Sequence, residues 1–88
     1  MNKYQLVDYF DVWKDRDGWQ VNDLCRVGEP ITISDDATDS DIIDYLKQIH
    51  FLGENANEEN VRVEWIDEFF VEFFEDATDL PLGRLERI

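Results

Sequence analysis

Residues 4–27 read YQLVDYFDVWKDRDGWQVNDLCRV, in which two runs rich in aromatic and aliphatic residues flank a short charged segment. The first run, residues 4–13, contains neither Gly nor Pro and is typical of a β-strand. Asp17-Gly18 is a strong tight-turn signal, because glycine accepts a positive φ angle at little cost. Residues 19–27 then predict a returning strand, so this part of the sequence indicates an antiparallel hairpin.

The clearest helix signals follow this hairpin. Thr38 or Ser40 can cap the helix N-terminus, and acidic residues occupy the first turn, where the helix dipole favours anions. Apolar side chains recur at the spacing of one helix stripe: Ile42, Tyr45, Leu46 and Ile49. Gly53 is expected to end the helix. The pattern predicts a helix over about residues 39–52.

Two further strands are predicted after a polar loop. Residues 61–65 alternate between apolar and charged types, and residues 69–74 form a compact aromatic run. Residues 76–88 contain Pro and Gly but keep large apolar side chains, so we expect a C-terminal extension that docks on the sheet. The prediction is a single α+β domain, residues 1–88, with β-β-α-β-β order. Its antiparallel sheet would carry one helix packed on one face.

The predicted strands are apolar on both faces, and one short helix can cover only one face. The second face must be covered by the C-terminal tail, by curvature of the sheet, or by another chain. The aromatic residues that point to this second face are of types enriched in interface cores. They form a candidate aromatic interface: Tyr9, Trp13, Phe70 and Phe74.

The chain is strongly acidic, with 22 Asp and Glu residues against eight Lys and Arg and a formal net charge of −14. Because 43% of its residues are hydrophobic and 14% aromatic, the composition indicates a folded chain rather than a disordered one. Such a charge repels nucleic acid and anionic lipid, and it attracts a protein with a basic surface. We expect the electrostatic interface in two groups: Asp35, Asp36, Asp39, Asp41 and Asp44, and Glu72, Glu75, Asp76 and Asp79.

The sequence contains no motif of an enzyme or a metal site. Cys25 and His50 are the only residues of their types, and they indicate a small core residue and a helix-end residue rather than a catalytic pair. An EF-hand register that places Gly18 at the loop glycine fails, because Trp13 and Leu24 would occupy ligand positions. We therefore expect no catalytic residue, metal or cofactor. A single cysteine and the lack of an apolar run of about 20 residues predict a cytoplasmic protein without membrane contact.

Two functions from different classes fit these features. The first is a non-enzymatic inhibitor that imitates nucleic acid. Alternate residues of a strand lie roughly 6.6–6.8 Å apart, about twice the ~3.4 Å axial spacing of phosphates in one DNA strand. In size, charge and α+β pattern the chain resembles small acidic proteins of phages and mobile elements, some of which block nucleases or CRISPR effectors. The alternative is a protein-interaction or assembly module that uses the aromatic face, for example as a homodimer, with the charge serving solubility.

Overall fold

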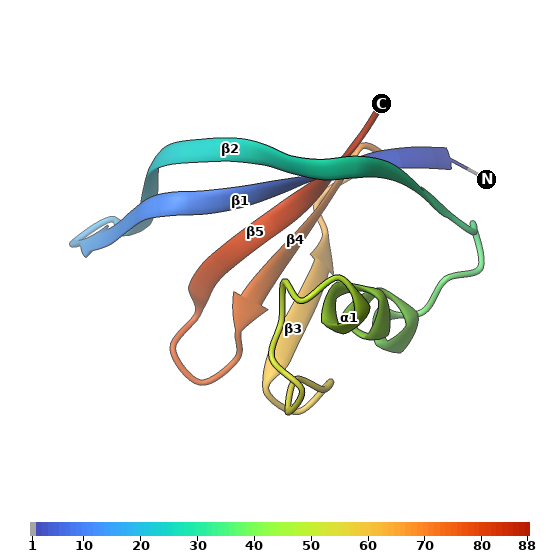
Figure 1. Ribbon diagram of the computed structural model, residues 1–88. Coiled ribbons are helices and arrows are strands. Elements are labelled where there is room, and N and C mark those ends of the chain that lie inside the picture. The colour runs from blue at the N-terminus through green and yellow to red at the C-terminus, as the bar shows by residue number, and fades with distance from the viewer. Residues whose placement is uncertain (1) are drawn as a thin grey trace.

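The computed structural model describes residues 2–88 and contains five strands and one helix (Figure 1). The elements are β1 (Asn2–Asp15), β2 (Gly18–Ile33), α1 (Asp39–Gln48), β3 (Val61–Trp65), β4 (Phe70–Glu75) and β5 (Leu80–Arg87). The strands form one antiparallel sheet in the order β2-β1-β5-β4-β3. The predicted α+β class is confirmed.

The C-terminal segment is a central strand of this sheet and not a docked extension, which corrects the sequence prediction. Leu85 of β5 pairs with Leu6 of β1 on one side and with Val71 of β4 on the other. The element order is therefore β-β-α-β-β-β. Pro81 is tolerated because it lies beside a register irregularity of the β4–β5 pair, where a missing backbone N–H costs less.

Gly83, the other residue that argued against a strand, is required by close packing. A Cβ atom at this position would lie 2.7 Å from the carbonyl oxygen of Val7 and 2.8 Å from the ring of Phe51. The Phe51 ring thus occupies the space that a side chain at position 83 would take. It also packs edge-on against the ring of Phe73, with 6.3 Å between the two ring centres. A tertiary contact explains this glycine, and the local sequence gave no sign of it.

The predicted hairpin is present and longer than expected. Its turn is formed by Arg16 and Asp17, and Gly18 has a φ angle of 108°. β2 continues through a bulge near Gly28, whose φ is 72°, so residues 31–33 extend the same strand. β5 pairs with β1 only over Tyr4–Asp8, so the far end of the hairpin projects from the sheet as a two-stranded ribbon (Figure 1).

α1 begins as predicted and ends earlier. Thr38 is the N-cap: its hydroxyl accepts from the Asp41 N–H at 3.2 Å, and Asp41 Oδ2 accepts from the Thr38 N–H at 3.0 Å. The helix stops at Gln48 instead of residue 52. His50 takes the left-handed conformation with φ of 64°, and the Phe51 N–H donates to the Leu46 carbonyl at 2.9 Å. The helix therefore ends four residues before the predicted end, and the left-handed residue that follows it is His50 and not Gly53.

The core lies between α1 and the strands β1, β3, β4 and β5. Ile42, Ile43 and Leu46 of α1 are buried against Val71 and other sheet residues. Ile43 was not part of the predicted stripe, whereas Ile49, which was, is 40% exposed. The buried side of the helix is thus formed by Ile42, Ile43 and Leu46, while Tyr45 is half-buried at the edge of the core. Every described residue of β2 remains at least partly exposed.

No helix within residues 2–88 has the length and apolarity that crossing a membrane requires.

Candidate functional site

Of the four residues of the predicted aromatic interface, only Trp13 is exposed, at 45%, and it lies on the projecting hairpin. Tyr9 is buried, and Phe70 and Phe74 are half-buried on the sheet face opposite α1. The guanidinium of Arg84 lies 6.0 Å from the centre of the Tyr9 ring and 5.4 Å from that of Phe70. Strand β5 therefore supplies a cation that covers two of the predicted interface rings.

A second arginine lies over the ring of Phe74. The guanidinium of Arg62 lies 4.7 Å from the centre of the Phe74 ring. On the face opposite α1, arginines of the same chain thus lie over three of the four predicted interface rings, of which Phe70 and Phe74 remain half-buried. We call Arg62 and Arg84 the arginine layer.

The second predicted acidic group is largely paired inside the molecule. Tyr9 Oη donates to Glu72 at 2.5 Å, and Thr78 Oγ1 donates to Glu75 at 2.8 Å. Arg62 lies 2.6 Å from Asp79 and 3.6 Å from Asp76. These carboxylates balance the arginine layer and hold the β4–β5 turn, so they do not form a free row of charges.

The pKa values of two groups reflect this pairing. Burial raises the pKa of Tyr9 far above its ordinary value of 10.0, and the hydrogen bond and negative charge of Glu72 raise it further. The hydrogen bond to Asp79 raises the pKa of Arg62 from its already high value. Both shifts show that these carboxylates act on neighbours in the same chain.

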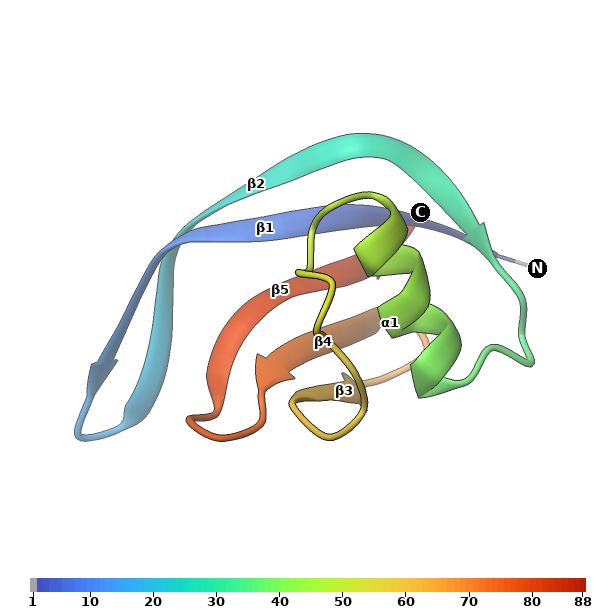
Figure 2. The same ribbon diagram turned by 60° about the horizontal axis from the view of Figure 1, so that its bottom comes forward.

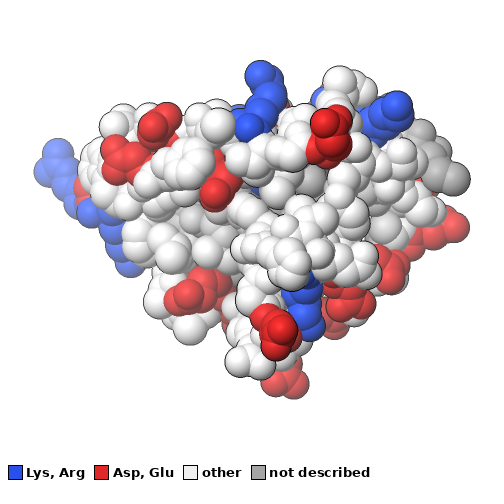
Figure 3. All heavy atoms as spheres, in the orientation of Figure 1, with Lys and Arg blue, Asp and Glu red and all other residues white. Residues whose placement is uncertain are grey.

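The first acidic group is differently placed, and we call it the acidic side: Asp35, Asp36, Asp39, Asp41 and Asp44. All five are exposed, in the β2–α1 connection and on α1. Asp41 caps the helix, and Asp35 accepts from the Asn2 amide at 3.2 Å. Within residues 2–88, Asp36, Asp39 and Asp44 form no ion pair with Lys or Arg. Figure 3 shows carboxylates gathered on the side of the molecule where α1 lies.

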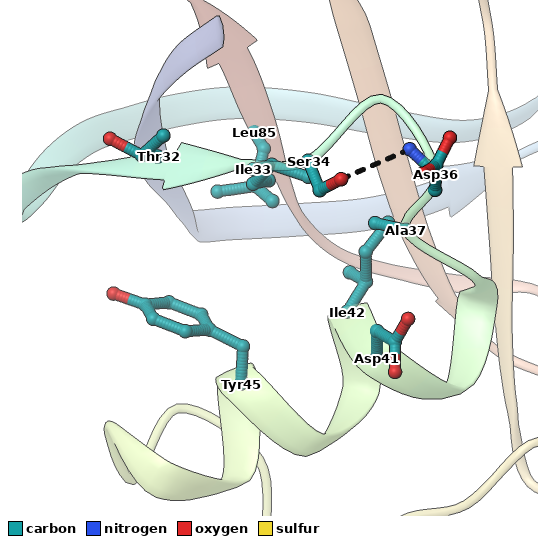
Figure 4. Close-up of a pocket in the computed structure, with 9 residues that line it drawn as sticks. All are labelled: Thr32, Ile33, Ser34, Asp36, Ala37, Asp41, Ile42, Tyr45 and Leu85. Carbon is teal, nitrogen blue, oxygen red and sulfur yellow. Dashed lines mark hydrogen bonds between the residues drawn. The ribbon is translucent and has the colours of Figure 1, made fainter. Parts of the chain in front are cut away.

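A cavity of about 330 Å³ lies beside the acidic side, between the end of β2 and α1 (Figure 4). Ile42 reaches from α1 toward Ile33 and Leu85, and the ring of Tyr45 lies below the end of β2. The lining is mainly apolar, and Asp36 and Asp41 lie at its edge. An apolar hollow bordered by carboxylates suits a ligand group that is both apolar and cationic.

A third exposed feature was missed by the sequence analysis. Trp65, Ile66 and Phe69 are 44%, 57% and 49% exposed around the β3–β4 connection. Asp67 Oδ1 accepts from the N–H groups of Phe69 at 2.6 Å and Phe70 at 3.1 Å, so Phe69 lies in an Asx turn and not in β4. The sequence signal was this Asp, which favours a turn through its side chain.

Cys25 and His50, the two residues considered for catalysis, lie on different elements of the fold and are both exposed. Cys25, which was predicted to be a core residue, is exposed on the edge strand β2, and His50 is exposed at the end of α1. In the part of the chain that is described, no three His, Cys, Asp or Glu side chains are grouped so that they could hold a metal ion. The chain matches no family model, no curated protein and no solved structure.

Proposed function

We propose that this chain is a non-enzymatic binding protein that recognises the basic surface of a partner protein through its acidic side. The observation that carries the proposal is the contrast between the two acidic groups. Asp36, Asp39 and Asp44 are exposed without an ion pair to Lys or Arg in residues 2–88, whereas Asp76 and Asp79 pair with Arg62. Carboxylates that the fold leaves unpaired remain available to cations of a partner.

Exposed charges of one sign act mainly on recognition. They steer an oppositely charged protein during its approach and reject partners of the same sign, and this effect weakens as salt rises. The acidic side also contains the cavity edge formed by Asp36 and Asp41, where a cation could be placed beside apolar surface. Charge and shape therefore favour the same side of the molecule.

The nucleic-acid-mimic form of the hypothesis receives less support from the structure. The spacing argument depended on carboxylates along strands, and the strand-associated group from Glu72 to Asp79 is used inside the chain. Asp36, Asp39 and Asp44 lie in a loop and on a helix, where the spacing of alternate strand residues does not apply. We therefore propose a basic protein partner in general, without requiring that it bind nucleic acid.

The test compares two triple variants in affinity capture from the native host at low and high salt. D36N/D39N/D44N removes three charges from the acidic side, and D17N/D23N/E59Q removes three exposed charges elsewhere. We expect the first variant to lose a partner that the wild type and the second variant retain at low salt, and high salt to release that partner from both. Equal capture by the two variants would contradict a local acidic interface.

A second candidate function is assembly through the β3–β4 connection. The observation that favours it is the exposure of Trp65, Ile66 and Phe69, since large apolar side chains grouped at one end of a molecule are typical of interaction sites. In this case analytical ultracentrifugation would show a mass above one chain even at high salt. The W65S/F69S variant would return the protein to a monomer.

A further inference from the structure

The cavity below the end of β2 is one part of a longer groove. A second cavity of about 520 Å³ shares Tyr45 with it, and a third of about 480 Å³ shares Asp8, His50 and Phe51 with the second. The three cavities follow one another along the α1 side of β1 and β2, and Figure 2 shows β2 curving beyond α1 along this path. We call the three together the β2 groove.

The groove exists because α1 is short and covers only part of the sheet. Val27, Ile31 and Ile33 of β2 pack against the edge of the core but are only half-buried. Phe10, at 60% exposure, belongs to the wall of the third cavity. The apolar groups of β2 thus resemble a core surface whose covering layer is missing.

Charge distinguishes this groove from a simple gap in packing. Acidic residues line all three cavities, and no Lys or Arg does: Asp36 and Asp41 in the first, Glu29 and Asp8 in the second, and Asp8 in the third. His50 is the only residue there that could carry a positive charge. The groove therefore combines an apolar surface with negative charge along its whole length.

Asp8 is the most informative of these residues. It lies opposite Gly83 of β5 and Cys25 of β2, in the same cross-strand row as Phe73, so its side chain is on the apolar α1 face. The residue is half-buried, and its carboxylate forms no hydrogen bond or ion pair with the described residues 2–88. A carboxylate at such a position gains from a cation that arrives with a ligand.

We infer that the β2 groove binds an extended segment of the basic partner whose groove-facing side carries both apolar side chains and Lys or Arg. The apolar side chains cover the exposed part of β2, and a Lys or Arg of the segment pairs with Asp8. Charge complementarity selects this occupant over an acidic or purely apolar one, since acidic residues line all three cavities of the groove and no Lys or Arg does. This inference rests on the proposed function and names the chemistry of its partner.

The probe is a labelled peptide of about 12 residues in which pairs of Leu alternate with pairs of Lys, so that each face of the extended peptide carries both residue types. At ~3.3 Å per extended residue it covers the 38 Å long axis of the protein. A second peptide replaces every Leu by Ser and keeps the charge. Binding to the intact chain is followed by fluorescence anisotropy. We expect the Leu–Lys peptide to bind at least about tenfold more tightly than the Ser–Lys peptide, because only the former can cover apolar surface.

Two matched pairs of variants locate the binding. Ile49→Lys places a cation in the groove, and Ile66→Lys makes the same change at another exposed isoleucine, outside the groove. Asp8→Asn removes the carboxylate from the groove, and Asp23→Asn removes one from the outer hairpin. We expect Ile49→Lys and Asp8→Asn each to weaken the Leu–Lys peptide by about tenfold or more, and the two controls to change it little.

The outcomes separate this inference from the proposed function. Asp8→Asn is expected to keep or raise the melting temperature, so a loss of binding cannot be assigned to unfolding. Equal binding of the two peptides, sensitive to D36N/D39N/D44N, would overturn the groove and leave the acidic side as the interface. Sedimentation as a dimer that Ile49→Lys breaks and Ile66→Lys does not would also overturn it, because a second copy would then occupy the groove.

Discussion

On the sheet face opposite α1, arginines from β3 and β5 lie over aromatic rings, whereas on the α1 face β2 extends past the helix and remains uncovered. The first face is completed inside the chain: Arg84 covers Tyr9 and Phe70, and Arg62 covers Phe74. The second face is complete over β3, β4, β5 and the start of β1, where Leu6, Phe73 and Leu85 are buried. The same sheet thus has a closed face and a partly open one.

This difference also divides the acidic residues. On the closed face, Glu72, Asp76 and Asp79 act on groups of their own chain and contribute little to an external field. Beside the open region, Asp8, Asp36 and their neighbours keep their charge for solvent or for a partner. Net charge alone does not identify an interface, because pairing within the fold decides which charges remain available.

The largest effect is expected where the α1 face is complete. Phe73→Ala removes a fully buried ring and should lower the free energy of unfolding by about 3–5 kcal/mol. Ile31→Ala, on half-buried β2, should lower it by less than ~1.5 kcal/mol, because less apolar surface is lost. Urea unfolding measures both values. Equal losses would mean that β2 is packed as tightly as β4, and the open region would then not exist.

The local parts of this fold could be predicted from the sequence. Asp17-Gly18 identified the hairpin, and Thr38 with the acidic first turn identified the start of α1. β5 was missed because Pro81 and Gly83 are poor strand residues locally. They are tolerated by a register irregularity in the β4–β5 pair and by the ring of Phe51, respectively.

The candidate site was less accessible from sequence than the fold. The acidic residues were visible, but which of them are paired depends on contacts between distant positions, such as Tyr9 with Glu72, 63 residues apart. The β2 groove depends on the curvature of a strand and on the length of the helix that faces it. Neither the curvature of β2 nor the length of α1 relative to it can be read from the spacing of apolar residues in a single sequence.

The next largest effect on stability is expected from Arg84, on the closed face. Arg84→Gln should lower the free energy of unfolding by about 1–2 kcal/mol, because the cation over the rings of Tyr9 and Phe70 is lost. The control is Arg26→Gln. Both arginines form an ion pair with Glu86, Arg84 at 2.5 Å and Arg26 at 3.6 Å, but the Arg26 side chain is 74% exposed. We expect this control to change stability by less than ~0.5 kcal/mol. A loss as large as that of Arg84→Gln would assign the effect to the ion pair and not to the rings.

A pH titration examines the buried Tyr9 on the same face. Because the pKa of Tyr9 is raised in the folded state, the folded protein favours the protonated phenol. The corresponding stability is fully present below the unfolded tyrosine pKa of about 10, and it is lost as the pH rises above that value. At neutral pH, Tyr9→Phe should cost about 1 kcal/mol for the hydrogen bond to Glu72.

The measurement is unfolding by urea at a series of alkaline pH values, with tyrosinate absorbance as a second signal. Wild-type protein and Tyr45→Phe should lose stability above pH 10, while Tyr9→Phe should lose less over the same interval. Identical alkaline losses in all three proteins would show that Tyr9 is not held protonated by the closed face.

The smallest effect concerns His50, at the junction between α1 and the open groove. Its left-handed conformation, with φ of 64°, is unfavourable for a residue with a Cβ atom. His50→Gly should therefore raise the free energy of unfolding by about 0.5–1 kcal/mol, while Gly53→Ala, at a position without positive φ and with open space around it, should change it little. His50 borders two of the three groove cavities. A higher free energy of unfolding for His50→Gly would therefore show that the packing of the His50 side chain is not needed for stability. A loss would mean that the imidazole closes the groove, and the α1 face would then be more complete than the exposure of β2 indicates.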